Sequence, residues 1–189
     1  MTGDRAAWDA LGAQIRRCVA CEDLASTRTM VVVGQAPPGA RLALVGEAPG
    51  AAEDASGEPF VGRAGQLLDG LLGEAGLARS DVAVVNTLKC RPPRNRAPKA
   101  GELARCRGWL DAQLTLLAPT LIVAMGSTAV CWFHGRNARI GLLRGGPQVV
   151  GGRDVLVTYH PSAALRFGPR GAPMLALRDD LALAARLVA

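Results

Sequence analysis

Four short apolar runs recur along the chain, and each ends in a polar or glycine-containing segment. The runs are Leu42–Val45, Val82–Val85, Leu121–Ala124 and Val155–Val157. Nearly continuous apolar runs of this length are typical of strands buried on both faces of a sheet. A further β-like run, Val31–Gly34, precedes them. The pattern predicts a central sheet of four strands.

Apolar residues at helical spacing occupy the segments between these runs. They predict helices over Arg5–Arg17, Ala64–Ala75, Ala100–Leu117 and Ala172–Val188, with a shorter helix after Ser127, its expected N-cap. Alternating strands and helices indicate a parallel sheet covered on both faces. We therefore expect the α/β class, as a three-layer α/β/α sandwich with a central four-stranded parallel sheet. The length of 189 residues suits one domain spanning 1–189.

The polar segments after the strands are candidates for chemistry. They are Gly46–Gly50, Asn86, Gly126-Ser127 and Tyr159–Ser162. Ligands bind beyond the carboxyl ends of the strands in open parallel sheets. We expect all four segments to face one crevice.

Charge changes this picture by suggesting a partner. The net charge is +6, and only Lys89 and Lys99 of the 22 basic residues are lysines. Arginine suits bidentate contact with phosphate, which favours a nucleic acid, although arginine beside abundant alanine and glycine also fits a bias in coding composition. The proline-rich stretch Arg91–Pro98 should expose its basic side chains. No apolar stretch reaches about 18 residues, so we expect a soluble, intracellular protein without membrane contact.

Four of the five cysteines form a candidate metal site. Cys18 and Cys21 are separated by two residues, and Cys90 and Cys106 follow later. A tetrahedral zinc ion, an iron–sulfur cluster and a redox-active pair all fit this spacing. Cys131 lies in an apolar run and is expected to be a buried small side chain.

Nearly the whole chain resembles one family, the family 4 uracil-DNA glycosylases. The stretches that carry the resemblance are Cys18–Cys21, Thr29–Gly34, Gly46–Gly50 with Glu53-Asp54, Gly57–Gly62, Asn86–Pro93, Asn95–Pro98, Cys106 and His160–Ala163. Each stretch is weak alone, but their order and spacing together are specific. The resemblance implies a DNA repair enzyme that flips uracil out of DNA and excises it by hydrolysis, leaving an abasic site. It also implies a [4Fe–4S] cluster on Cys18, Cys21, Cys90 and Cys106.

The resemblance further implies a base pocket formed by four residues. Phe60 would stack on uracil, although core packing is the alternative for this ring. Asn86 would pair with uracil O4 and N3–H, although an asparagine at a strand end also caps turns. Ala48 and Asn95 would complete substrate binding.

Three further residues would carry the chemistry. His160 would donate a hydrogen bond to uracil O2 as negative charge develops on the leaving base. Glu47 would position the attacking water and support the oxocarbenium-like sugar, and Glu53 is a second candidate carboxylate. Either carboxylate can instead hold its loop through backbone amides. Because neither lysine is placed to attack the sugar, we expect no lyase activity.

Contacts with DNA are expected from two segments. They comprise Arg91, Arg94, Ser162, Leu165 and Arg166, with Leu165 or Arg166 entering the space vacated by the flipped base. The expected partner is uracil-containing DNA, single- or double-stranded. We expect a monomer in the cytoplasm of a bacterium or archaeon, associated with the nucleoid.

Three alternatives remain open at this stage. One is the same chemistry on another deaminated base, hypoxanthine or xanthine. Another is a non-enzymatic four-cysteine metalloprotein that binds nucleic acid. A dinucleotide-binding protein is disfavoured, because Gly46–Gly50 lacks the three-glycine pattern and Pro49 removes an amide.

Overall fold

The central sheet contains five strands, one more than predicted. A computed structural model describes residues 5–189, so the first four residues of the expected domain lie outside the described residues. The strands are β1 (Leu42–Gly46), β2 (Val82–Asn86), β3 (Leu121–Met125), β4 (Gln148–Val150) and β5 (Arg153–Thr158), in the order β2-β1-β3-β5-β4. The four predicted strands are parallel, whereas β4 pairs antiparallel with β5 at one edge. The four-stranded count was wrong because β4 is only three residues long.

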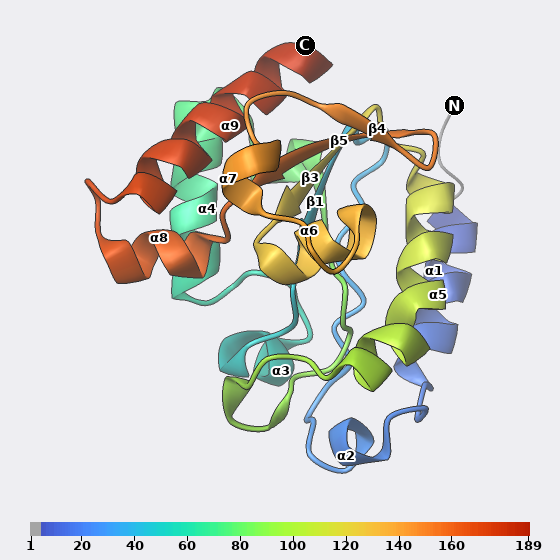
Figure 1. Cartoon of the computed structure of the whole chain (residues 1–189). Helices are drawn as coiled ribbons and strands as arrows, with labels where there is room; N and C mark the ends of the chain where they lie inside the picture. The colour runs from blue at the N-terminus through green and yellow to red at the C-terminus, as the bar shows by residue number, and fades with distance from the viewer. Residues whose placement is uncertain (1–4) are drawn as a thin grey trace.

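Helices cover both faces of the sheet and give the expected three layers (Figure 1). The long helices are α1 (Arg5–Arg16), α4 (Arg63–Glu74), α5 (Ala100–Leu117), α6 (Ser127–His134) and α9 (Ala172–Val188). The short ones are α2 (Glu22–Ala25), α3 (Ala51–Ser56), α7 (Ile140–Leu143) and α8 (Pro161–Phe167), with 3-10 turns η1 (Arg79–Asp81) and η2 (Pro93–Asn95). Helices α4, α8 and α9 lie on one side of the sheet, and α1 and α5 lie on the other (Figure 1).

The strands alternate their side chains between two apolar cores. Leu44, Val84 and Leu156 pack with α4 and α9, whereas Val45 and Val157 pack with α5 and α6. Each fully buried side chain of this size contributes about 1.5–3 kcal/mol through removal of apolar area from water. A third cluster surrounds the cysteines. The sheet is therefore a rigid base whose carboxyl ends present the candidate residues.

Three local predictions were wrong for identifiable reasons. Ser127 is the first residue of α6, and Gly126, with φ of 87°, is the N-cap. Residues 31–34 form no strand, although the Val32 amide donates to the Lys89 carbonyl and the neighbouring Gln35 bridges Val84 on β2. The segment Ser162–Arg166, expected to contact DNA, lies within helix α8, where no helix was predicted. Within residues 5–189, no helix is both long and apolar enough to cross a membrane.

Candidate active site

Gly46, Asn86 and Phe60 meet at the carboxyl ends of the two neighbouring strands β1 and β2. Gly46 and Asn86 are register partners at these ends. A Cβ built on Gly46 would lie 2.5 Å from Asn86 Oδ1 and 2.6 Å from the Phe60 ring, so only glycine fits. Asn86 Oδ1 is buried and has no hydrogen-bond partner in the part of the chain that the structure describes. Because an unpaired buried carbonyl costs about 1–3 kcal/mol, this oxygen is a strong candidate for binding a ligand N–H.

Phe60 lies in the loop between α3 and α4 and is almost fully buried. Its side chain packs in the core cluster that contains α4 and α9, and its ring centroid is 5.6 Å from that of His160. The residue adopts the left-handed backbone region, with φ of 55°. This conformation costs a non-glycine residue roughly 1–2 kcal/mol. Surrounding contacts must therefore hold the loop.

His160 is the N-cap of α8, where its imidazole binds the first turn of its own helix. Its Nδ1 accepts a hydrogen bond from the Ser162 amide at 3.1 Å and lies 2.9 Å from Ser162 Oγ. Burial lowers the pKa of His160 to about 4, and the Glu53 carboxylate opposes the shift. The ring is therefore neutral at pH 7. Since Nδ1 is an acceptor, the single ring proton resides on Nε2, which is then a donor.

Glu47 directly follows β1, and its side chain is hydrogen-bonded to the neighbouring helix α6. Its Oε2 accepts a hydrogen bond from the hydroxyl of Thr128, in the first turn of α6. Its backbone carbonyl accepts from Thr87 Oγ1 at 2.6 Å and from the Leu88 amide at 2.9 Å. Thr128 was not predicted, although a threonine in the first turn after a glycine-ended strand is a recognisable signal. The arrangement fixes a half-buried carboxylate at the strand ends.

Glu53 is placed differently from the catalytic carboxylate that was expected. Its Oε2 accepts from the Gly50 amide at 3.0 Å, and its Oε1 accepts from the amides of Val61 and Gly62 at 3.0 and 2.8 Å. Both oxygens are thus occupied by backbone donors. This geometry favours the alternative reading, in which Glu53 holds the loop.

The remaining pocket candidates are Ala48 and Asn95. Ala48 packs against the cluster of side chains around the cysteines. Asn95 is exposed in η2, and its Oδ1 accepts from Arg91 Nε at 2.7 Å. Arg94 is also exposed, with φ of 55°.

Helix α8 carries an exposed apolar and basic surface beside His160. Ser162 and Arg166 are exposed, and Leu165 is 37% exposed. Phe167, which was not predicted, is 65% exposed at the last position of the helix. Exposed large apolar side chains beside a site often mark a contact surface.

The four predicted ligand cysteines line one small, mostly apolar cavity between the C-terminal end of α1 and helix α5. Cys90 and Cys106 are buried, whereas Cys18 and Cys21 are partly exposed. Burial raises the pKa of Cys106 to about 11 and also raises the pKa of Cys90. Arg28 donates from Nη1 to Cys90 Sγ at 3.1 Å and from Nη2 to the Cys18 carbonyl at 2.8 Å. Among residues 5–189, no group of three or more His, Cys, Asp or Glu side chains forms a site for a single metal ion.

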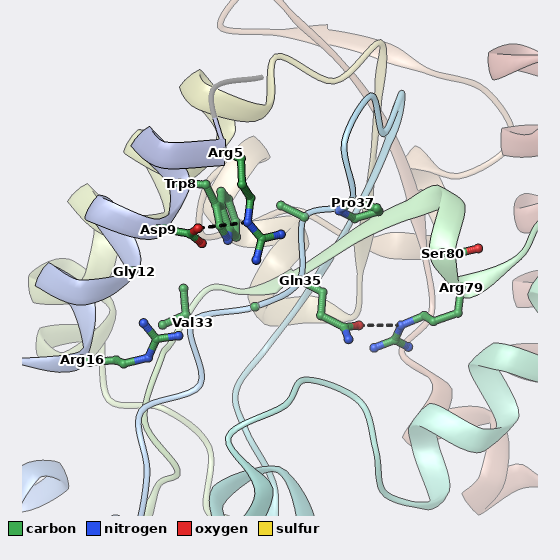
Figure 2. A pocket seen from close by; sticks show the side chains of 12 residues that line it. Arg5, Trp8, Asp9, Gly12, Arg16, Val33, Gln35, Pro37, Arg79 and Ser80 are labelled. Carbon is green, nitrogen blue, oxygen red and sulfur yellow. Dashed lines mark hydrogen bonds and ion pairs between the residues drawn. The ribbon is translucent and has the colours of Figure 1, made fainter. Parts of the chain in front are cut away.

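A larger pocket, of about 530 Å³, lies between α1, residues 33–37 and η1 (Figure 2). It contains none of the predicted site residues. Arg79, on its far wall, donates to Gln35 Oε1 at 3.1 Å, as Figure 2 shows, and to the Pro59 carbonyl at 2.6 Å. Through Arg79, this pocket adjoins the loop that bears Phe60.

Comparisons with known proteins identify the family of the chain. Residues 33–182 match the uracil DNA glycosylase superfamily. The chain is 46% identical over 155 residues to the type-4 uracil-DNA glycosylase of Thermotoga maritima, covering 81% of this chain and 80% of that protein. It is 40% identical over 164 residues to the type-4 enzyme of Pyrobaculum aerophilum, covering 80% of this chain and 81% of that protein. It is 34% identical over 154 residues to a type-5 uracil-DNA glycosylase of Thermus thermophilus, covering 69% and 68%.

Proposed function

The chain belongs to the uracil-DNA glycosylase superfamily, and from that premise we propose that it excises uracil from DNA by hydrolysing the N-glycosidic bond. The observation that carries the proposal is the buried, unpartnered Asn86 Oδ1 beside the Phe60 ring. Uracil offers an N3–H to such an acceptor and a flat face to such a ring. Cytosine has a lone pair at N3, so it would leave the oxygen unpaired, and the cost of that unpaired group discriminates against it.

His160 then stabilises the leaving base. Its Nδ1 is occupied by the Ser162 amide, so Nε2–H is the donor that faces the developing charge on uracil O2. A neutral donor suits this role because the lowered pKa keeps the ring uncharged across the physiological range. The proton stays on the ring, and uracil departs as an anion held by hydrogen bonds.

Glu47 orients the attacking water. Thr128 binds its Oε2, which leaves Oε1 for a water molecule on the sugar side. The same carboxylate supports the positive charge that develops on the sugar. Glu53 contributes indirectly, through the loop that its oxygens hold.

Neither lysine can form a covalent intermediate with the sugar, so we infer a monofunctional enzyme. Lys89 is 1% exposed and donates to the Asn86 carbonyl and to Gln113 Oε1. Lys99 is exposed, and its Nζ lies 3.0 Å from Asp23. The product is an abasic site in an uncut strand.

Two exposed surfaces would bind the DNA on either side of the pocket. Arg94 and Asn95 are exposed in η2, and the half-buried Arg91 lies just before it; the Arg96–Glu102 ion pair, at 2.6 Å, ties this segment to α5. The exposed side chains of α8 would enter the duplex where uracil leaves it. The η2 and α8 surfaces together suit a backbone-binding rim around the flipped base.

Cys18, Cys21, Cys90 and Cys106 would hold a [4Fe–4S] cluster. The four side chains line one cavity, and a thiolate donor set in apolar surroundings suits iron–sulfur chemistry. When bound, the cluster would cross-link the segments on which the cysteines lie.

A base-release assay tests the function. Purified protein is incubated with matched single- and double-stranded oligonucleotides that contain uracil, hypoxanthine or xanthine. Release of uracil with an intact strand is expected, and Asn86→Ala should abolish release while DNA binding persists. Release of hypoxanthine or xanthine without release of uracil would change the assigned substrate. DNA binding without release of any base would indicate a non-enzymatic DNA-binding protein. Iron and sulfide content with visible absorbance tests the cluster, and a colourless zinc protein would contradict it.

A further inference from the structure

Two adjacent buried carboxylates on the short helix α3 bind two different segments of the chain. Glu53 and Asp54 are 9% and 3% exposed. Neighbouring residues on a helix project about 100° apart, so each can reach a different partner. Neither carboxylate has an ion-pair partner in the part of the chain that the structure describes. Both are satisfied by backbone amides.

Asp54 holds the segment next to the cysteines. Its Oδ1 accepts from the amides of Thr29 and Met30 at 3.0 and 3.3 Å, and its Oδ2 lies 3.1 Å from the Thr29 amide. Arg28, which precedes Thr29 in the chain, donates to Cys90 Sγ and to the Cys18 carbonyl. The Met30 side chain also packs against the backbone of Gly57, at the end of α3. Thr29 and Met30 thus contact this helix at Asp54, and Met30 also lies beside its C-cap residue, Gly57.

Glu53 holds the loop that bears the stacking ring. Its bonds to Val61 and Gly62 constrain the residues that follow Phe60, and Arg79 binds the carbonyl of Pro59, which precedes it. Phe60 itself has the unfavourable φ of 55°. A strained residue keeps its conformation only where flanking contacts over-determine it. The position of the ring therefore depends on how firmly α3 is held.

We propose that Asp54 is a positioning residue for base release, which anchors α3 to the Thr29–Met30 segment so that Glu53 keeps Phe60 in place beside Asn86. Asp54 touches neither substrate nor reacting atoms and acts through α3. The activity measurements below rest on the proposed uracil excision. The linkage of the Thr29–Met30 segment to the Phe60 loop through α3 does not depend on that function.

Two substitutions of Asp54 should give graded effects. Asparagine keeps one oxygen that can accept from both amides but removes the charge that strengthens the bonds. Alanine removes every acceptor. Asp54→Asn should weaken binding of free uracil by about threefold, and Asp54→Ala should weaken it by about tenfold and lower kcat by a similar factor. Asp179→Ala, an exposed carboxylate on α9, is the matched control and should leave both unchanged.

Hydrogen exchange provides the readout that is independent of activity. The amides of Val61 and Gly62 should exchange faster in Asp54→Ala than in the parent protein, while visible absorbance and iron content stay the same. If the parent protein releases no uracil, the proposed function is refuted. Hydrogen exchange still tests the linkage in that case, because it does not depend on activity. Unchanged exchange at these two amides would refute the linkage itself.

A double-mutant cycle with Phe60→Ala tests whether Asp54 acts through the ring. If it does, the double variant should lose little more uracil affinity than Phe60→Ala alone. Effects that multiply would overturn the proposal. If Asp54→Ala fails to fold, Asp54→Asn provides the test. Uracil affinity and hydrogen exchange equal to those of the parent protein in Asp54→Asn would also overturn the proposal.

Discussion

A methyl group added at Gly46 should damage the base pocket more than any change to its rim. The new Cβ of Gly46→Ala would lie 2.5 Å from Asn86 Oδ1 and 2.6 Å from the Phe60 ring. Carbon atoms do not approach neighbours this closely, so Asn86 or Phe60 must move. Overpacking of this kind costs about 1–3 kcal/mol of folding free energy. Displacing the two proposed contacts to uracil, at about 1.5 kcal/mol each, should lower kcat/KM by roughly a hundredfold.

Urea unfolding and base release, measured side by side, check this expectation. Gly70→Ala is the control, because its Cβ on α4 would meet nothing within 4 Å. That substitution should raise the free energy of unfolding by about 0.5–1 kcal/mol, through helix propensity, and leave base release unchanged. If Gly46→Ala releases uracil at the parent rate, the pocket does not lie between Gly46, Asn86 and Phe60, and the reasoning fails.

Three further outcomes follow from the geometry. Glu47→Gln should lower single-turnover base release by at least about a hundredfold, with unchanged affinity for free uracil, because it keeps the shape but loses the charge; parent-like turnover would remove Glu47 from the chemistry. His160 has a folded pKa of about 4, below the unfolded value of about 6.5, so the unfolded chain takes up this proton first as pH falls. The free energy of unfolding should therefore drop between pH 6.5 and 4 in denaturant titrations, and His160→Gln should lose that part of the drop. Cys106→Ser should lose visible absorbance and bound iron and unfold at a lower temperature than the parent protein, and a variant that keeps its full iron content would remove Cys106 from the ligand set.

Sequence periodicity located the strand ends well, because buried parallel strands are apolar along their whole length and the residues that follow them are not. Asn86 ends β2 and His160 lies just beyond β5, as expected. The helix α8 was missed although its signals were present: Pro161 is at its first position and His160 caps it. The strand β4 was missed because three residues carry no readable alternation.

The roles of the carboxylates could not be read from the sequence. Glu53 looked catalytic because it lies near Glu47 in one loop, yet its Oε1 accepts from the amides of Val61 and Gly62, which follow Phe60 in a turn where this residue has a left-handed backbone. Such partners depend on tertiary geometry rather than on local pattern. The closeness of Gly46 to Asn86 likewise depends on the register between β1 and β2.

The strand order also determines when the site is completed during synthesis. Gly46 and Asn86 come from β1 and β2, which pair directly and are made early. His160 arrives with β5, which pairs with β3 and is the last strand of the chain. A nascent chain that ends before β5 can assemble Gly46 and Asn86, the half of the pocket proposed to bind the base, but lacks His160, the proposed donor to the leaving base. Release of an abasic site, a product that is itself a lesion, therefore requires that synthesis has passed β5 and His160.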